Sequence, residues 1–353
     1  MSATHKNEGV RVHTAALCLL CRTPGQALYT GLRDRLFGAP GDWSLLQCPD
    51  CGLVWLNPRP IPEDIPKLYA AYYTHPHSGE TPSARGTLRS KLKWQVLASA
   101  FGYRERRAGP VCRILGPILS QIGPLRDKVG GTAMWLKAAE RGRLLDVGCG
   151  DGRFLKQMQD LGWEATGVEP DPVAFHAARA ARRVDVRLGT LEEIALPGGA
   201  FDVVTMNNVI EHVFDPIRTL GECYRVLRQD GYLTLVTPNI ESVGRRWFDR
   251  AWMHWDPPRH LFLFSATTLR QCLESVGFEI CEVRTTAREA SGTWNISSVI
   301  RRDGLAPERQ LEALSQRLGL VALLYWGVEH FLTNLACWGE ELIILAKRKD
   351  ERD

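Results

Sequence analysis

The chain has 353 residues, 44% of them hydrophobic, and 44 Lys and Arg against 40 Asp and Glu give a formal net charge of +4. This is enough apolar material for one large or two modest domains, and the composition excludes collagen-like, disordered and disulfide-dense chains. The early apolar run at 15–20 contains a cysteine and is too short for a secretory signal. We therefore expect a cytoplasmic protein, whose cysteines are thiols or metal ligands rather than disulfides.

The first motif along the chain consists of four cysteines in two Cys-x-x-Cys pairs, which are separated by 26 residues: Cys18, Cys21, Cys48 and Cys51. Each pair lets two thiolates approach one ion from a tight turn, and Gly52 gives the second turn its backbone freedom. Four thiolates are typical of a tetrahedral structural zinc, and they leave no coordination position open for catalysis. We predict a zinc-ribbon-like module over residues 1–60.

Residues 61–140 begin as a proline-rich connector that leads into a short helix, and they continue as a basic region. Between Thr81 and Gly130 there are ten Lys or Arg against two acidic residues, and glycines and prolines interrupt the region repeatedly. We expect several short amphipathic helices here. A basic helical face can contact an anionic membrane or a nucleic acid, or it can simply be solvated, and the pattern leaves these alternatives open.

From Arg141 onward, strand-like runs alternate with helical ones. Strands are predicted at 144–147, 165–168, 184–188, 201–206, 232–236 and 278–283, and helices at 153–161, 172–183 and 216–227. Such alternation predicts an α/β fold with a mostly parallel sheet and helices on both faces. We assign 141–290 to this core, with an aromatic insertion at 241–264, followed by a helical insertion at 291–338 and a closing strand and tail at 339–353.

The first strand of this core runs into a turn with three glycines at every second position. Ligands of such sheets bind at the carboxyl ends of the strands, and glycines let a ligand approach the backbone in front of the helix that follows. Arg153 replaces the third glycine of the dinucleotide fingerprint, which favours a smaller nucleoside over NAD. Glu169 ends the second strand, where its carboxylate can accept both ribose hydroxyls.

The apolar stretch 320–338 is long enough to suggest a membrane segment, but Glu329, His330, Thr333 and Asn334 form one polar stripe on a helix. A spanning helix would also separate the predicted strand at 340–347 from its sheet. We expect a helix that packs on the core, forms a dimer face or lies in a membrane interface. Together with the basic region, the last alternative would place the protein at the inner face of the membrane.

Four segments resemble successive motifs of the class I S-adenosylmethionine (SAM)-dependent methyltransferases: LLDVGCGDG, GVEPDP, LPGGAFDVVTMNNVIEHVFDP and VLRQDGYLTLVTPN. GEELIILAKRK at 339–349 resembles the closing antiparallel strand of that fold. The resemblance implies a Rossmann-like seven-stranded sheet, here with a small N-terminal zinc-binding module and helical additions. The chain is also similar to bacterial methyltransferases with a CPDCGLVWLNPRP-like segment, which are associated with glycan or lipid assembly, and in its core to ubiquinone-biosynthesis O-methyltransferases.

The resemblance implies SAM as the cofactor. Glu169 would bind the ribose, and Thr190 and Leu191 lie where the family contacts adenine. The complete set of expected cofactor-binding residues is Asp146, Gly148, Cys149, Gly150, Gly152, Glu169, Thr190, Leu191 and Asn207.

Methyl transfer to an alcohol requires a base that takes the hydroxyl proton. The candidates are Glu211 and His212, which follow the fourth strand, and His260 in the aromatic insertion. Asp215-Pro216 reads as the start of the next helix, which predicts Glu211 and His212 at the rim of the site. For both histidines a purely structural role is the alternative.

Some relatives in the ubiquinone and small-RNA methyltransferase families hold a divalent metal with Glu-x-x-Glu-His and a further histidine. Here Asn208 replaces the first acid, so we favour base catalysis without a metal.

We expect O-methylation of a sugar, a glycolipid or another small-molecule or lipid-linked acceptor. One alternative is a nucleotide-sugar C-methyltransferase, because these enzymes share a four-cysteine zinc module. Another is an RNA-directed methyltransferase that uses the zinc module and the basic region. We do not favour a nucleic-acid partner, because exposed aromatic residues are not interleaved with basic ones in the module. A cofactor-binding protein without turnover is the non-enzymatic alternative.

Overall fold

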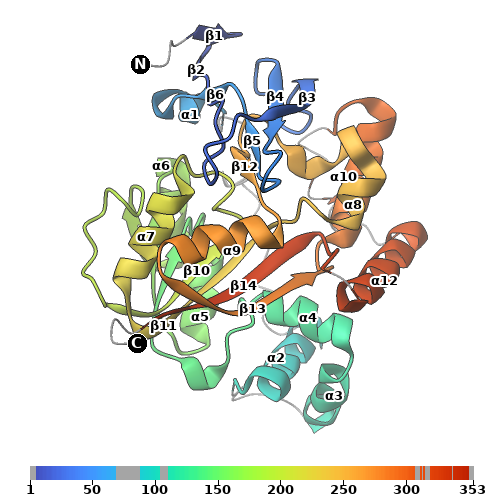
Figure 1. The fold of residues 1–353 in the computed structure, drawn as a ribbon. Helices are drawn as coiled ribbons and strands as arrows, with labels where there is room; N and C mark the ends of the chain where they lie inside the picture. The colour runs from blue at the N-terminus through green and yellow to red at the C-terminus, as the bar shows by residue number, and fades with distance from the viewer. Residues whose placement is uncertain are drawn as a thin grey trace. The chain divides into compact units, whose positions relative to one another are not determined.

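The computed structural model describes residues 5–68, 88–103, 110–306, 311, 313–314, 319–335 and 337–349 (Figure 1). Parts of the helices expected within 61–140 and 291–338 therefore lie outside the described residues. The chain forms two compact units. The first contains Met1–Tyr73, Met206–Tyr224 and Leu235–Asp353, and the second contains Thr74–Thr205 and Arg225–Thr234.

The predicted α/β core is present as a seven-stranded sheet with the order β13-β14-β11-β10-β7-β8-β9. Its strands are β7 (Arg143–Val147), β8 (Glu164–Glu169), β9 (Asp185–Leu188), β10 (Phe201–Asn207), β11 (Leu227–Pro238), β13 (Phe278–Thr286) and β14 (Glu341–Arg348). β7, β8 and β9 pair in parallel, and β14 pairs antiparallel with β13, which confirms the predicted closing strand. The continuous apolar run in β7 is buried, as a strand covered on both faces requires.

Helices α5 (Arg153–Asp160), α6 (Pro172–Ala177), α7 (Pro216–Val226) and α9 (Ala266–Ser275) begin at recognisable capping residues. The Asp171 carboxylate accepts the Val173 N–H at the start of α6, and the Asp215 carboxylate accepts the Arg218 N–H at the start of α7. The second cap confirms the predicted Asp-Pro helix start. The helix predicted at 172–183 is shorter than expected, because a π-helical turn takes over at Ala178–Arg182.

In the second unit, the basic region forms α2 (Leu88–Phe101), α3 (Pro110–Ser120) and α4 (Gly123–Gly131), which lie together in Figure 1. Residues 81–87 and 104–109 of the predicted region are outside the described residues. Tyr103 connects this region to the core, because its hydroxyl accepts the Trp163 indole N–H and donates to the Leu136 carbonyl, each at 3.0 Å. Part of the basic region is thus packed against buried residues that precede β7 and β8 rather than solvated on every side.

In the first unit, the N-terminal residues form two small sheets, β1-β2-β6 and β12-β5-β4-β3. Their strands are β1 (His5–Asn7), β2 (Val10–His13), β3 (Gln26–Leu32), β4 (Trp43–Gln47), β5 (Val54–Leu56), β6 (Arg59–Pro60) and β12 (Phe262–Leu263). β12 comes from the predicted aromatic insertion and pairs antiparallel with β5. The cysteine module and the insertion therefore share one sheet. As the prolines predicted, β6 is followed by a single 3-10 turn and by α1 (Ile65–Leu68).

The first unit also contains α8 (Val243–Phe248), α10 (Ala290–Asp303) and α12 (Leu320–Leu335). α10 and α12 pack through Trp294 and Tyr325, whose ring centroids are 4.7 Å apart. Within the described ranges, every helix is too short or too polar to cross a bilayer.

Candidate active site and metal centre

The glycine turn that follows β7 has the conformation that its sequence requires. Gly148, Gly150 and Gly152 all have positive φ, at 69°, 54° and 76°. A Cβ at Gly152 would lie 2.9 Å from Val184, whereas a Cβ at Gly150 would meet no atom within 4 Å. The turn is thus packed on its inner side and open at Gly150, where a ligand can approach the backbone.

Asp146 is buried at the end of β7, and its carboxylate accepts a hydrogen bond of 2.7 Å from the hydroxyl of Thr205 on β10. Burial, together with the nearby charge of Glu169, raises the pKa of Asp146 to about 7, although the hydrogen bond from Thr205 acts in the opposite direction. A buried carboxyl in this state is well suited to a cationic ligand, whose charge would favour ionisation.

Glu169 ends β8 with both carboxylate oxygens oriented by backbone amides. One oxygen accepts the Gly150 N–H at 2.7 Å, and the other accepts the Asp171 N–H at 2.9 Å. Burial raises its pKa. Each oxygen retains a second lone pair, so the carboxylate can still accept a hydroxyl while it holds the glycine turn.

The other expected cofactor residues have varied surroundings. Leu191 is buried, and Thr190 donates its backbone N–H to Glu193 at 2.9 Å. Cys149 is buried against Gly167, where a Cβ would lie 2.5 Å from its sulfur. Asn207 is exposed at the end of β10.

The three expected catalytic side chains lie together in the first unit. The ligand atoms of Glu211, His212 and His260 are all within 4.8 Å of one another, and the two imidazole centroids are 4.7 Å apart. The expectation that Glu211 lies at the rim is wrong, because its side chain is fully buried. One of its oxygens accepts the Thr237 hydroxyl at 2.9 Å, and the other has no hydrogen-bond partner among the described residues.

Backbone carbonyls determine the tautomers of both histidines. His212 Nδ1 lies 3.1 Å from the Arg259 carbonyl, and His260 Nδ1 lies 2.7 Å from the His254 carbonyl. Because a carbonyl can only accept, each Nδ1 carries the proton and each Nε2 carries a lone pair. Burial lowers the pKa of His212 to about 4 and that of His260 well below its usual value, while burial raises the pKa of Glu211 to about 8.

An ion pair beneath the 207–208 turn was not anticipated from the sequence. Arg288 donates to both oxygens of Glu341, at 2.7 and 3.0 Å, and to the Asn207 carboxamide oxygen at 2.9 Å. Asn208 donates to Glu341 at 3.3 Å and has a positive φ of 54°. The pair therefore fixes the turn that leads to Glu211.

A second buried ion network holds the loop that carries His260. Arg259 binds Asp34 of the N-terminal module at 2.8 Å, forms two hydrogen bonds with Asp256 and donates to the Leu68 carbonyl at 3.2 Å. The Arg259 and Asp34 side chains are completely buried. The same Arg259 provides the carbonyl that orients His212. Arg259 and Arg288 lie outside the segments that resemble methyltransferase motifs, and nothing in the sequence marks Thr205 and Thr237, within those segments, as partners of buried carboxyl groups.

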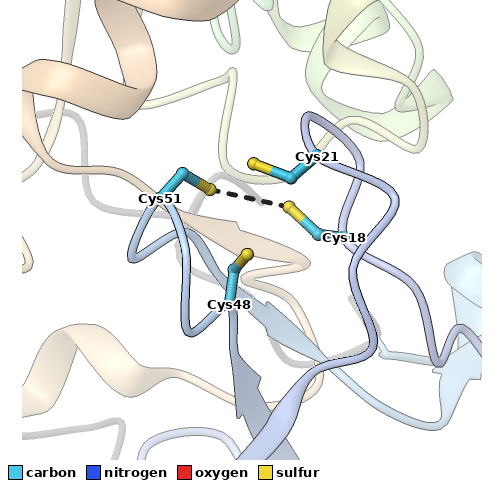
Figure 2. A group of neighbouring side chains, drawn as sticks. All are labelled: Cys18, Cys21, Cys48 and Cys51. Atoms are coloured by element: carbon cyan, nitrogen blue, oxygen red, sulfur yellow. Dashed lines mark hydrogen bonds between the residues drawn. The ribbon is translucent and has the colours of Figure 1, made fainter.

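The four cysteines converge in one cluster, and Figure 2 shows their sulfur atoms directed toward a common centre. All four sulfurs lie within 4.8 Å of one another, and those of Cys18 and Cys51 are 3.6 Å apart. Each turn closes on its first cysteine, since the Arg22 N–H donates to the Cys18 carbonyl and the Gly52 N–H to the Cys48 carbonyl. Gly52 has a positive φ of 80°, as expected. The donor set is compatible with zinc.

Comparison with known proteins adds three findings. A family model described as "Methyltransferase domain" matches residues 121–283. A "Probable S-adenosylmethionine-dependent methyltransferase" of Mycolicibacterium smegmatis is 35% identical over 143 residues, which are 39% of this chain and 52% of the relative. A "Ubiquinone biosynthesis O-methyltransferase" of Azorhizobium caulinodans is 30% identical over 186 residues, which are 48% of this chain and 72% of the relative.

Several further relatives, from Cereibacter sphaeroides, are matched over only 50% of their length, so the chain spans about half the length of many of the curated relatives it matches. A solved structure from Thermotoga maritima, described as a SAM-dependent methyltransferase and possible histamine N-methyltransferase, is 25% identical. The match covers 59% of this chain and 82% of the Thermotoga chain, at a TM-score of 0.40. From the family model and the Azorhizobium relative, the chain belongs to the class I SAM-dependent methyltransferases.

Proposed function

We propose that the protein transfers a methyl group from SAM to an oxygen of a small acceptor, such as a sugar, a glycolipid or another lipid-linked molecule. The observation that carries the proposal is the cluster of Glu211 and His212, which follow β10 of a methyltransferase sheet, with His260 from the loop before β12; Glu211 and His260 are buried and His212 is half-buried. Both histidines keep an Nε2 lone pair because their Nδ1 protons point to backbone carbonyls. An acceptor hydroxyl needs a base of this kind to take its proton, whereas a neutral amine acceptor can react through its own lone pair.

In the proposed reaction, the acceptor oxygen forms a bond to the donor methyl carbon as the bond from that carbon to sulfur breaks. The sulfur keeps the electron pair, which leaves S-adenosylhomocysteine, and the hydroxyl proton passes to an imidazole Nε2. His212 and His260 are suited to this role because burial keeps them neutral at pH 7. Glu211 retains its own proton near neutral pH, so it is assigned to orient the acceptor and the histidines.

The glycine turn and Glu169 are assigned to the adenosyl group of SAM. The opening at Gly150 and the two orienting amides on the Glu169 carboxylate support this assignment. Asp146 is assigned to the positively charged part of the cofactor, because its buried carboxyl lacks a cationic partner in the described residues.

We further propose that the four cysteines hold a structural zinc. Cys18, Cys21, Cys48 and Cys51 would be the four ligands, and such a closed site would organise the module without taking part in chemistry.

A divalent cation at Glu211, His212 and His260 is a second candidate, which one orphaned oxygen favours. Glu211 Oε1 is buried without a hydrogen-bond partner among the described residues, although Asn208 offers only a carboxamide where metal-binding relatives have an acid. Bound there, a divalent cation would polarise an acceptor oxygen. The protein residues would still hold the acceptor and receive its proton.

The proposal is tested with methyl-labelled SAM and a cell extract, followed by mass spectrometry and NMR of the labelled product. A label on oxygen supports it, whereas a label on a sugar carbon or on RNA would favour one of the alternatives. His212→Ala should lower turnover by about 10²- to 10⁴-fold and leave SAM affinity within a factor of about two. His176→Ala, at an exposed position on α6, is the control and should retain full activity. Wild-type activity in His212→Ala would eliminate this residue as the base.

A further inference from the structure

Helix α12 carries its apolar side chains on the outside. Glu329, its one acidic residue, is fully buried and accepts the Glu340 backbone N–H at 2.6 Å. Leu320, Leu324, Val328 and Phe331 follow one another at helical spacing and are between 55% and 75% exposed. This arrangement reverses the usual orientation of a surface helix, in which the apolar stripe faces the core.

Contacts with the rest of the first unit fix this orientation. The Tyr325 hydroxyl donates to Glu340 at 2.7 Å, its ring packs against Trp294, and Ala322 is buried beside them. A rotation that buried the apolar stripe would carry Glu329 and Tyr325 away from Glu340, the residue just before β14. The buried contacts of α12 therefore keep its apolar face directed outward.

Tryptophan and arginine side chains lie beside α12. The side chain of Trp247 is 58% exposed, and its ring centroid lies 6.1 Å from that of Trp294, the residue that packs against α12. The exposed Arg246 lies over the ring of Trp338 at 4.6 Å, and Arg301 donates to the Trp247 carbonyl. An apolar stripe beside tryptophans and arginines has the chemistry of a membrane–water interface, where tryptophan rings lie at headgroup depth and arginines meet anionic lipids.

We propose that the outward face of α12 docks on an anionic lipid bilayer, with the helix lying in the interface rather than crossing it. A second copy of the chain fits less well, because a two-fold contact would bring the arginines beside α12 of both copies into one interface. Lipid phosphates would instead neutralise Arg246 and Arg301. The proposal does not depend on methyl transfer, since it concerns binding alone.

The test is flotation of the full-length protein with vesicles of phosphatidylcholine, with or without phosphatidylglycerol. The wild type should bind the anionic vesicles, and added salt should weaken that binding. Replacing Leu324, Val328 and Phe331 together by Ser should lower the bound fraction by about tenfold or more, because the exposed apolar area is lost. The matched control replaces Ile114, Ile118 and Ile122, which are also exposed, by Ser and should bind like the wild type.

Circular dichroism and light scattering accompany the flotation, so that a misfolded variant is recognised. If the α12 variant is misfolded, Arg246→Gln with Arg301→Gln replaces it and should lower binding to anionic vesicles only. Failure of the wild type to float would overturn the proposal, as would equal loss in both triple variants. A dimer that the α12 substitutions convert to a monomer, without any vesicle binding, would assign the face to a second copy instead.

Discussion

At the scale of single residues, ionisation of Asp146 has opposite effects on stability and on the binding of a cationic cofactor. Its carboxyl is buried beside Glu169 and receives one hydrogen bond, from Thr205, so burial raises its pKa to about 7. The raised pKa means that folding favours the protonated form. The contribution to stability is therefore present at low pH, and it is lost as the pH rises through about 7.

Binding of a cation should have the opposite pH dependence. We predict that SAM affinity falls as the pH drops from about 8 to about 5.5, by up to about tenfold per unit below the pKa, because the protonated carboxyl attracts the cofactor less. Asp146→Asn should bind SAM weakly at every pH and be more stable than the wild type at alkaline pH. Calorimetry and thermal unfolding measure the two effects, and Asp160→Asn on α5 is the control. A flat affinity profile in the wild type would remove Asp146 from the cofactor site.

At the scale of elements, Arg259 joins segments that are far apart in the sequence. Its guanidinium lies between Asp34, in the turn after β3, and Asp256, in the loop before β12, and all three side chains are buried. Its own carbonyl orients His212. The N-terminal module and the histidine loop are therefore held by one side chain.

Removing this side chain should be costly. Arg259→Met leaves two buried carboxylates without a cation and should lower the free energy of unfolding by about 3–5 kcal/mol. The stability of Arg259→Lys should lie between that of the wild type and that of Arg259→Met. Lysine keeps the positive charge, but its ammonium group cannot replace the planar set of guanidinium donors. Denaturant unfolding provides the measurement. The control is Arg302→Met, which removes an exposed ion pair with Asp303 and should change the free energy of unfolding by less than about 1 kcal/mol. If Arg259→Met changed stability as little as this control, the buried ion network would not stabilise the fold.

The elements show which parts of the fold the sequence predicts. The strands of the core, the glycine turn and the Asp215 helix cap follow from local periodicity and turn chemistry, and all of them are present. Pairing between distant segments is not encoded locally. β12 joins β5 across about 200 residues, and the N–H groups of Leu261 and Phe262 reach the carbonyl of Glu211. That packing covers Glu211, which is why the position predicted for it at the rim is wrong.

At the scale of the whole molecule, the first unit connects the cysteine cluster to the proposed base through continuous backbone pairing. Cys48 and Cys51 frame the turn that leads into β5, and β5 pairs with β12. Leu261, just before β12, accepts the Leu56 N–H at its carbonyl at 3.0 Å and donates its own N–H to the Glu211 carbonyl at 2.7 Å. The glycine turn belongs to the second unit. If the proposed zinc is bound at the four cysteines, its loss should therefore disturb the histidine loop more than the cofactor turn.

We predict that Cys48→Ser loses zinc, lowers the melting temperature and reduces methyl-transfer turnover, while SAM affinity changes by less than about threefold. The physical reason is that three remaining ligands hold zinc weakly, and an unpinned turn lets β5 and β12 move, so that Glu211 and His260 lose their positions. Cys281→Ser, at an exposed thiol on β13, is the control and should match the wild type. Elemental analysis, thermal unfolding and calorimetry give the three readouts. A wild type without zinc would refute the structural-zinc assignment, and a zinc-free variant with full turnover would show that the module does not support the base.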